Sequence, residues 1–173
     1  MGNFQENVKK ICSFYVSDWH LISMLLPYIS KHINIETKIT NITEKDLEDK
    51  IKEFISKLNL NKEIQDRILE MNWNKKAIYT YRKLDDRIKE EIIIISGNKQ
   101  YIDKMNKNIA KYLNKIEKQK KVTIINCYEV MEFNENIHEI LSLHDKILNT
   151  SGEKEIGEIF DGFQQKRDTA INE

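Results

Sequence analysis

The side chains best suited to chemistry fall in three short stretches that are far apart in the chain. The first carries Asp18 and His20, the second is Ser96-Gly97-Asn98, and the third carries Cys127 and Glu129. Together they supply an acid, a candidate base, a thiol and several hydrogen-bond formers, which is the inventory of a small-ligand site. They can act together only if the elements that precede them bring them to one place.

Each of the three stretches follows a segment with the composition of a β-strand. Residues 11–17 are rich in β-branched and aromatic side chains, and residues 91–96 contain four consecutive isoleucines. Such an isoleucine run predicts a strand buried on both faces, as in the interior of a parallel sheet, and 122–128 is similar. Residues 36–42 alternate between apolar and charged side chains, which is typical of an edge strand.

The segments between these strands have helical spacing of their apolar residues. Ser17-Asp18 supplies an N-cap for the first helix, in which Pro27 predicts a kink or a restart. Residues 134–148 form the predicted helix after the fourth strand. For 72–90 both a helix and a strand fit the pattern, and we favour the helix.

This order of elements predicts a single α/β domain. We expect a doubly wound, mostly parallel sheet of about four strands, Rossmann-like or flavodoxin-like, with helices on both faces. Right-handed crossovers favour the strand order 2-1-3-4. The domain is expected to span residues 1–150, followed by an amphipathic segment over 151–173.

In such sheets ligands bind beyond the carboxyl ends of the strands, where the strand order reverses. The residues predicted to line a ligand site there are Asp18, His20, Ser96, Gly97, Asn98, Cys127 and Glu129. Ser96-Gly97-Asn98 would open a helix and hold an anionic group, although no glycine-rich phosphate loop is present. The alternative is that Asp18, Ser96 and Asn98 are ordinary helix caps and turn formers.

Catalysis and metal binding find little support in the sequence. Cys127 with His20 as its base would be a nucleophilic pair, but a cysteine inside an apolar strand is more often a small buried hydrophobe. The four histidines include no pair at i, i+3 or i, i+4, and only two cysteines occur. We therefore assign no catalytic residue and expect neither a metal nor a cofactor.

The C-terminal segment carries its own apolar stripe at i, i+3, i+4 and i+7, formed by Ile156, Ile159, Phe160 and Phe163. A helix this short is marginal by itself and must dock on something. The candidates are its own sheet, a second copy of the chain, or the groove of a partner.

Charge and hydropathy exclude some classes of partner. The 28 basic and 28 acidic residues give a formal net charge of zero, whereas nucleic-acid binders need a surplus of Lys and Arg. A lysine cluster over 111–121 is the one argument for nucleic acid, and it is equally typical of a helix C-terminus. No apolar run approaches the roughly 20 residues of a membrane span, and the first residues lack a signal-peptide pattern, so a cytoplasmic location is expected.

Two functions remain in view. The first is a non-catalytic cytoplasmic regulatory or protein-interaction domain, which binds a protein partner or forms a homodimer through the C-terminal stripe. The second is a sensor or enzyme that binds a small anionic or nucleotide ligand at the strand ends. The doubly wound pattern is shared by many activities and does not choose between them.

Overall fold

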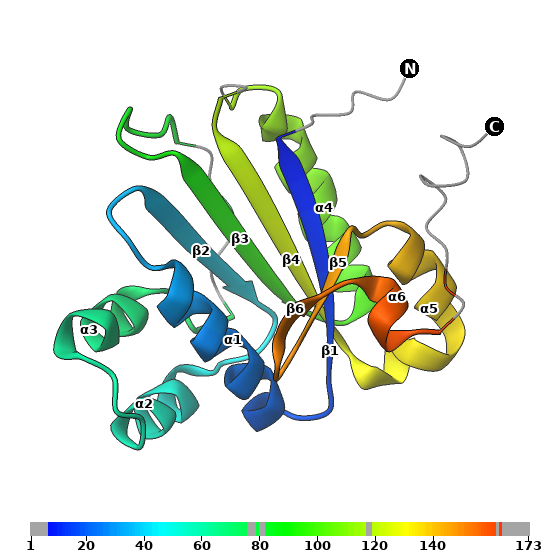
Figure 1. Ribbon diagram of the computed structural model, residues 1–173, viewed down its shortest axis with the longest axis horizontal. Helices are drawn as coiled ribbons and strands as arrows, with labels where there is room; N and C mark the ends of the chain where they lie inside the picture. The colour runs from blue at the N-terminus through cyan, green and yellow to red at the C-terminus, as the bar shows by residue number, and fades with distance from the viewer. Residues whose placement is uncertain (1–6, 76–78, 80–81, 117–118, 162, 164–173) are drawn as a thin grey trace.

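A six-stranded sheet forms the centre of the computed structural model, which describes residues 7–75, 79, 82–116, 119–161 and 163. The strand order is β2-β3-β4-β1-β5-β6, and only β6 runs antiparallel to its neighbour (Figure 1). The strands are β1 (Val8–Tyr15), β2 (Thr37–Thr43), β3 (Glu90–Gly97), β4 (Lys121–Glu129), β5 (Lys146–Asn149) and β6 (Gly152–Lys154). The predicted α/β fold with a mostly parallel sheet and alternating strands and helices is confirmed.

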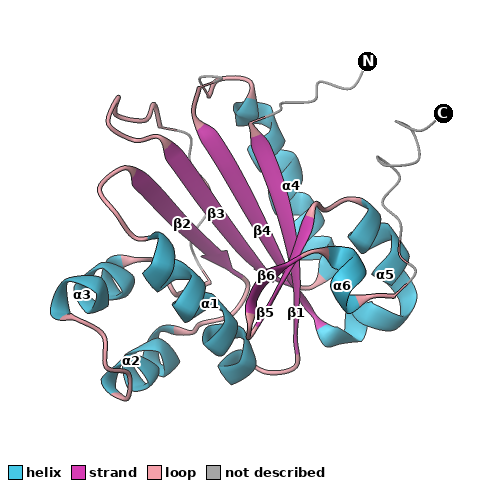
Figure 2. Cartoon of the chain, in the orientation of Figure 1, coloured by secondary structure: helices cyan, strands magenta, loops and turns pink. Residues whose placement is uncertain are grey.

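Helices cover both faces of the sheet (Figure 2). One face carries α1 (Asp18–His32), α2 (Glu48–Ser56) and α3 (Lys62–Glu70), and the other carries α4 (Lys99–Leu113), α5 (Phe133–Ser142) and α6 (Ile156–Ile159). The isoleucines of β3 divide between the two cores, because side chains alternate along a strand. Ile92 and Ile94 pack against α1, whereas Ile93 and Ile95 pack on the α4 side.

The predicted strand order 2-1-3-4 is wrong. β1 lies between β4 and β5, while β2 lies at the far edge beside β3. The cause is α1, whose buried residues Leu21 to Ile29 pack over Ile92, Ile94 and Ile125 of β3 and β4. The first crossover therefore passes over two strands before β2 joins the sheet. The length of a connection does not reveal how many strands it crosses.

The strand β5 replaces the end of the predicted helix over 134–148, and β6 follows it within the predicted C-terminal segment. α5 ends at Ser142, and β5 then pairs with β1 in parallel. Asp145 fixes the start of this pairing, because its backbone N–H donates to Lys10 O at 2.7 Å and its carboxylate accepts from Lys10 N at 2.9 Å. The chain then turns into β6 at Gly152, whose φ of +107° favours glycine.

The segment 72–90 is not the helix that we favoured: its described residues before β3 contain no helix, and 76–78 and 80–81 lie outside the described residues. Asn72 lies at the β2 edge, where its carbonyl accepts from Asn41 Nδ2 at 2.9 Å. Tyr79 is buried on the opposite face, in the core of α4. Described residues of this connection thus lie at the β2 edge and then on the α4 face, so the crossover to β3 returns on the α4 side, as right-handedness requires.

No helix within the described ranges combines the length and the apolar character needed to cross a bilayer.

A chain of buried polar side chains joins β4 to the helices of the α4 face. His144 lies just before β5 and is 4% exposed. Its Nδ1 donates to Ile140 O at 2.5 Å and its Nε2 accepts from Asn126 Nδ2 at 2.9 Å, while Asn126 Oδ1 accepts from Asn106 Nδ2 at 2.9 Å. This pattern requires a neutral imidazole, and burial lowers the pKa of His144 from 6.5 to about 4.

The buried imidazole predicts a specific acid sensitivity. Unfolding exposes His144 to water, so the unfolded chain takes up a proton near pH 6.5 that the folded chain refuses until about pH 4. The contribution of His144 to the free energy of unfolding is therefore fully present above pH 6.5 and is lost as the pH falls. The loss is about 2 kcal/mol between pH 7 and pH 5. Urea unfolding of His144→Gln should show a flatter pH dependence than the parent, and His138→Gln, which changes an exposed histidine, should not. Equal slopes for all three proteins would contradict this account.

Candidate functional site at the carboxyl ends of the strands

The strand order reverses between β1 and β4. These strands are parallel neighbours, with Tyr15 opposite Glu129 at their ends. The chain leaves β1 into α1 on one face of the sheet and leaves β4 through a 3₁₀ turn, η1 (Val130–Glu132), into α5 on the other. A topological switch point of this kind is where open α/β sheets usually bind their ligands. The ligand site that the sequence predicts at the strand ends would therefore lie around the ends of β1 and β4.

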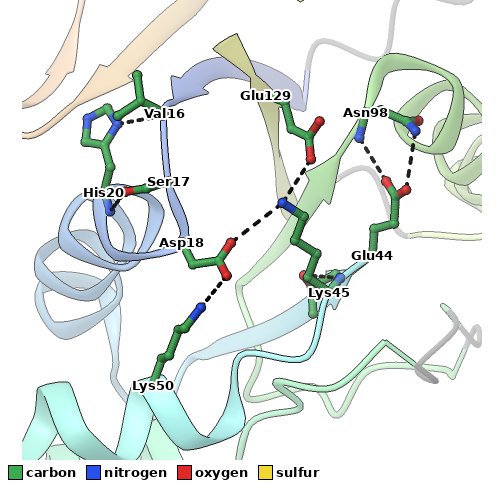
Figure 3. A network of polar contacts seen from close by, with 10 residues as sticks. Val16, Ser17, Asp18, His20, Glu44, Lys45, Lys50, Asn98 and Glu129 are labelled. Carbon is green, nitrogen blue, oxygen red and sulfur yellow. Dashed lines mark hydrogen bonds and ion pairs between the residues drawn. The ribbon is translucent and has the colours of Figure 1, made fainter. Parts of the chain in front are cut away.

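A network of ion pairs occupies this edge (Figure 3). Lys45 Nζ lies 3.1 Å from Glu129 Oε1 and 3.8 Å from Asp18 Oδ1, and Lys50 Nζ lies 2.6 Å from Asp18 Oδ2. The hydrogen bond to Glu129 raises the pKa of Lys45, and the charges of Glu129 and Asp18 add to the effect. The two predicted carboxylates are therefore neutralised by lysines of the same chain.

A third carboxylate, that of Glu44, lies at the N-terminus of α4. Asn98 caps this helix by accepting from Tyr101 N at 2.8 Å. Glu44 in turn accepts from the backbone N–H of Asn98 at 2.9 Å and from its side-chain amide at 3.3 Å (Figure 3). A helix N-terminus attracts anions, and here the chain supplies its own. An external anion would have to displace Glu44.

Gly97 allows this close approach of Glu44 to the helix. A Cβ atom at position 97 would lie 2.4 Å from Glu44 Oε2 and 2.8 Å from the ring of Tyr101. Both distances are shorter than van der Waals contact, so any larger residue would force these side chains apart. The glycine between Ser96 and Asn98 thus serves internal packing.

The remaining predicted residues lie beneath or beside the network. His20 Nδ1 accepts from Val16 N at 3.0 Å and its own N–H donates to Ser17 Oγ, so it fixes the turn into α1. Cys127 is fully buried, which raises the pKa of its thiol, and no hydrogen bond within the described structure joins it to His20. The catalytic alternative for this pair is therefore not supported. The Oγ of Ser96 is buried and, among the described atoms, has no partner.

Tyr15, at the end of β1, belongs to the site although its position in a strand hides it in the sequence. The side chain is 3% exposed. Burial raises the pKa of its phenol, and the charges of Glu129, Glu44 and Asp18 raise it further. The hydroxyl therefore stays protonated and is held near three carboxylates.

Neither Glu44 nor the two lysines is among the residues predicted from the sequence. Glu44 and Lys45 lie in Thr43-Glu-Lys-Asp46, which resembles a capping box. Their actual role depends on the placement of β2 beside β3, where Glu44 N donates to Ser96 O at 3.0 Å. The only feature of the sequence that points to Glu44 is its position directly after a predicted strand.

Large apolar side chains surround the network at the same edge of the sheet. Val16 follows β1 and is 68% exposed, and Met131 in η1 is 81% exposed. Trp19 and Val130 are each about two-fifths exposed, and Trp19 stacks on Phe54 of α2 with ring centroids 6.3 Å apart. Exposed Trp and Met side chains near a polar rim are typical of protein interfaces.

The predicted partner-binding stripe lies mostly on its own domain. β6 extends the sheet, and Ile156 is 1% exposed within the core of the α4 face. Phe160 and Phe163 pack against the same core, whereas Ile159 is 43% exposed. This segment therefore completes the core rather than offering its whole stripe to a partner.

No group of three or more His, Cys, Asp or Glu side chains that could hold a metal ion occurs in the part of the chain that the structure describes. The basic groups at the strand ends are already paired with carboxylates. The site thus combines three paired carboxylates, two of them held by lysines and one by the amides of Asn98, with apolar borders.

Comparison of the chain with protein-family models, with curated proteins and with solved structures finds no match. The fold and the site define the class: an α/β domain with a six-stranded mixed sheet and a switch point where two lysines pair with carboxylates of the same chain.

The contact between Gly97 and Glu44 can be tested by a double-mutant cycle. Gly97→Ala should lower the free energy of unfolding by about 1–3 kcal/mol, because the new methyl group overlaps the Glu44 carboxylate and the Tyr101 ring. In Glu44→Ala the same change should cost less, since one of the two clashes is gone. Gly157→Ala is the control, because its Cβ would meet only Phe163 O at 3.8 Å. Strict additivity in urea unfolding would argue against this contact.

Proposed function

We propose that this chain is a non-catalytic regulatory or interaction domain that works by binding another protein chain at the carboxyl ends of β1 and β4. The contact surface consists of Val16, Trp19, Val130 and Met131, hereafter the strand-end surface. The observation that carries the proposal is the exposure of these four side chains around a switch point whose charges are already paired.

The pairing of charges favours a protein partner over a small charged ligand. A ligand site normally keeps polar groups that converge on an empty volume. Here Lys45 and Lys50 are engaged by Asp18 and Glu129, and the helix amide of Asn98 is engaged by Glu44. The strand-end surface beside these pairs is apolar, and the burial of apolar area is the main favourable term in protein association.

Rigid support makes the surface suitable for binding. His20 fixes the backbone of Val16 through a 3.0 Å hydrogen bond, and Trp19 is held against Phe54. Lys50 links the start of α1 to α2 through Asp18. Side chains ordered before binding lose less conformational entropy when the complex forms.

We take a second copy of this chain as the partner. The formal net charge is zero, so two copies meet without long-range repulsion, and proteins near neutrality associate more readily than charged ones. The strand-end surface presents the same apolar groups on each copy, as an isologous dimer interface requires.

Sedimentation velocity over a range of micromolar concentrations tests the proposal. The parent should form a dimer, and the double variant Val16→Asp/Met131→Asp should remain monomeric, because two buried carboxylates without partners oppose association. Ile35→Asp is the matched control: Ile35 is 85% exposed but precedes β2 at the opposite end of the sheet. A monomeric parent, or an equal effect of Ile35→Asp, would refute self-association through this surface.

Anion binding at α4 is the competing function, and it makes a separate prediction. Because Glu44 already accepts from Asn98 N, millimolar phosphate should not raise the Tm of the parent above that in chloride of equal ionic strength. Glu44→Ala removes the internal anion and should gain a phosphate-dependent rise in Tm. Phosphate stabilisation of the parent would favour the ligand-binding function instead.

A further inference from the structure

A separate cavity of about 350 Å³ lies between α1 and the hairpin of β5 and β6. Its α1 wall consists of Met24, Pro27, Tyr28, Lys31 and His32, which fall on one side of the helix at i, i+3, i+4, i+7 and i+8. The hairpin wall runs from Leu148 to Glu153. None of these residues belongs to the strand-end surface, so the cavity is independent of the proposed dimer.

The inner part of the cavity is apolar. Met24 is 2% exposed and Leu148 is 1% exposed, and the buried side chain of Tyr28 also lines the cavity. Ser13 anchors this floor, because its Oγ donates to Leu148 O at 2.9 Å and lies 3.3 Å from Met24 Sδ. β6 is only three residues long and covers only part of this side of α1.

The outer part of the cavity carries two lysines and one carboxylate. Lys9 pairs with Glu153 at 2.9 Å, which neutralises one cation. Lys31, in the last turn of α1, has no ion-pair partner among the described residues. His32 stacks on Tyr28 with centroids 4.0 Å apart, and its Nδ1 donates to Tyr28 O at 2.8 Å.

We propose that this cavity binds a small amphipathic carboxylic acid with an aromatic or branched aliphatic body. The body lies on Met24, Tyr28 and Leu148, and the carboxylate pairs with Lys31 beside His32. A volume of about 350 Å³ is at the lower end of the range for small-molecule sites, which favours a compact acid. The surplus of cations over the single acid Glu153 favours an anionic head group over an amine.

Binding can be measured by NMR titration of the ¹⁵N-labelled chain with phenylacetate and with 4-methylpentanoate. Both acids should give saturable shifts of the amides of residues 148–153 and of the second half of α1. Phenylacetamide and phenethylamine keep the apolar body but lose the negative charge, and should bind at least about 10-fold more weakly.

Substitutions at Lys31 separate this site from non-specific attraction. Lys31→Glu should weaken phenylacetate binding by about 10-fold or more, and Lys31→Arg should retain it. Lys111→Glu is the matched control, because Lys111 is likewise the basic residue in the last turn of its helix, α4. The proposal is overturned if neither acid gives saturable shifts in these segments, if phenethylamine binds as well as phenylacetate, or if Lys31→Glu binds like the parent.

Discussion

The burial of β3 and β4 on both faces is the constraint on which the rest of the structure depends. Ile92 to Ile95 place alternate side chains into two separate cores, so helices must cover both sides of the sheet. α1 meets this need on one face by crossing β4 and β3, and that crossing sends β2 to the far edge. The switch point between β1 and β4 is a direct consequence, because their outgoing helices then leave toward opposite faces.

Electrostatic compensation within the chain gives the strand ends their character. Parallel strands and helix N-termini gather polar groups at one edge, and an open α/β sheet commonly uses them for a ligand. In this chain Lys45, Lys50 and Glu44 occupy the positions that ligand charges would take. The result is a firm edge with exposed apolar borders, while the cavity beside α1 keeps a cation without an ion-pair partner in the described chain.

Much of the fold could be predicted because the signals are local. The isoleucine run indicates a buried strand whatever surrounds it, and the caps Ser17 and Asn98 bond within their own first turns. Of the predicted site, Asp18, Asn98 and Glu129 meet in adjoining parts of one polar edge. Their partners Lys45 and Glu44 could not be predicted from the sequence. The residues 43–46 fit both a capping box and a contact at the end of a strand, and only the position of the neighbouring strand distinguishes the two.

The sequence by itself determined the class of fold, the positions of the four long strands and the helix caps Ser17 and Asn98, because periodicity and capping act over a few residues. The tertiary structure decided the strand order, the two added strands and the fate of the C-terminal stripe. Those features depend on pairings between distant segments, such as Asp145 with Lys10. They also depend on the surfaces against which α1 and Ile156 pack. The spacing of apolar residues predicts that one face of a helix is buried, but it does not identify the surface that covers this face.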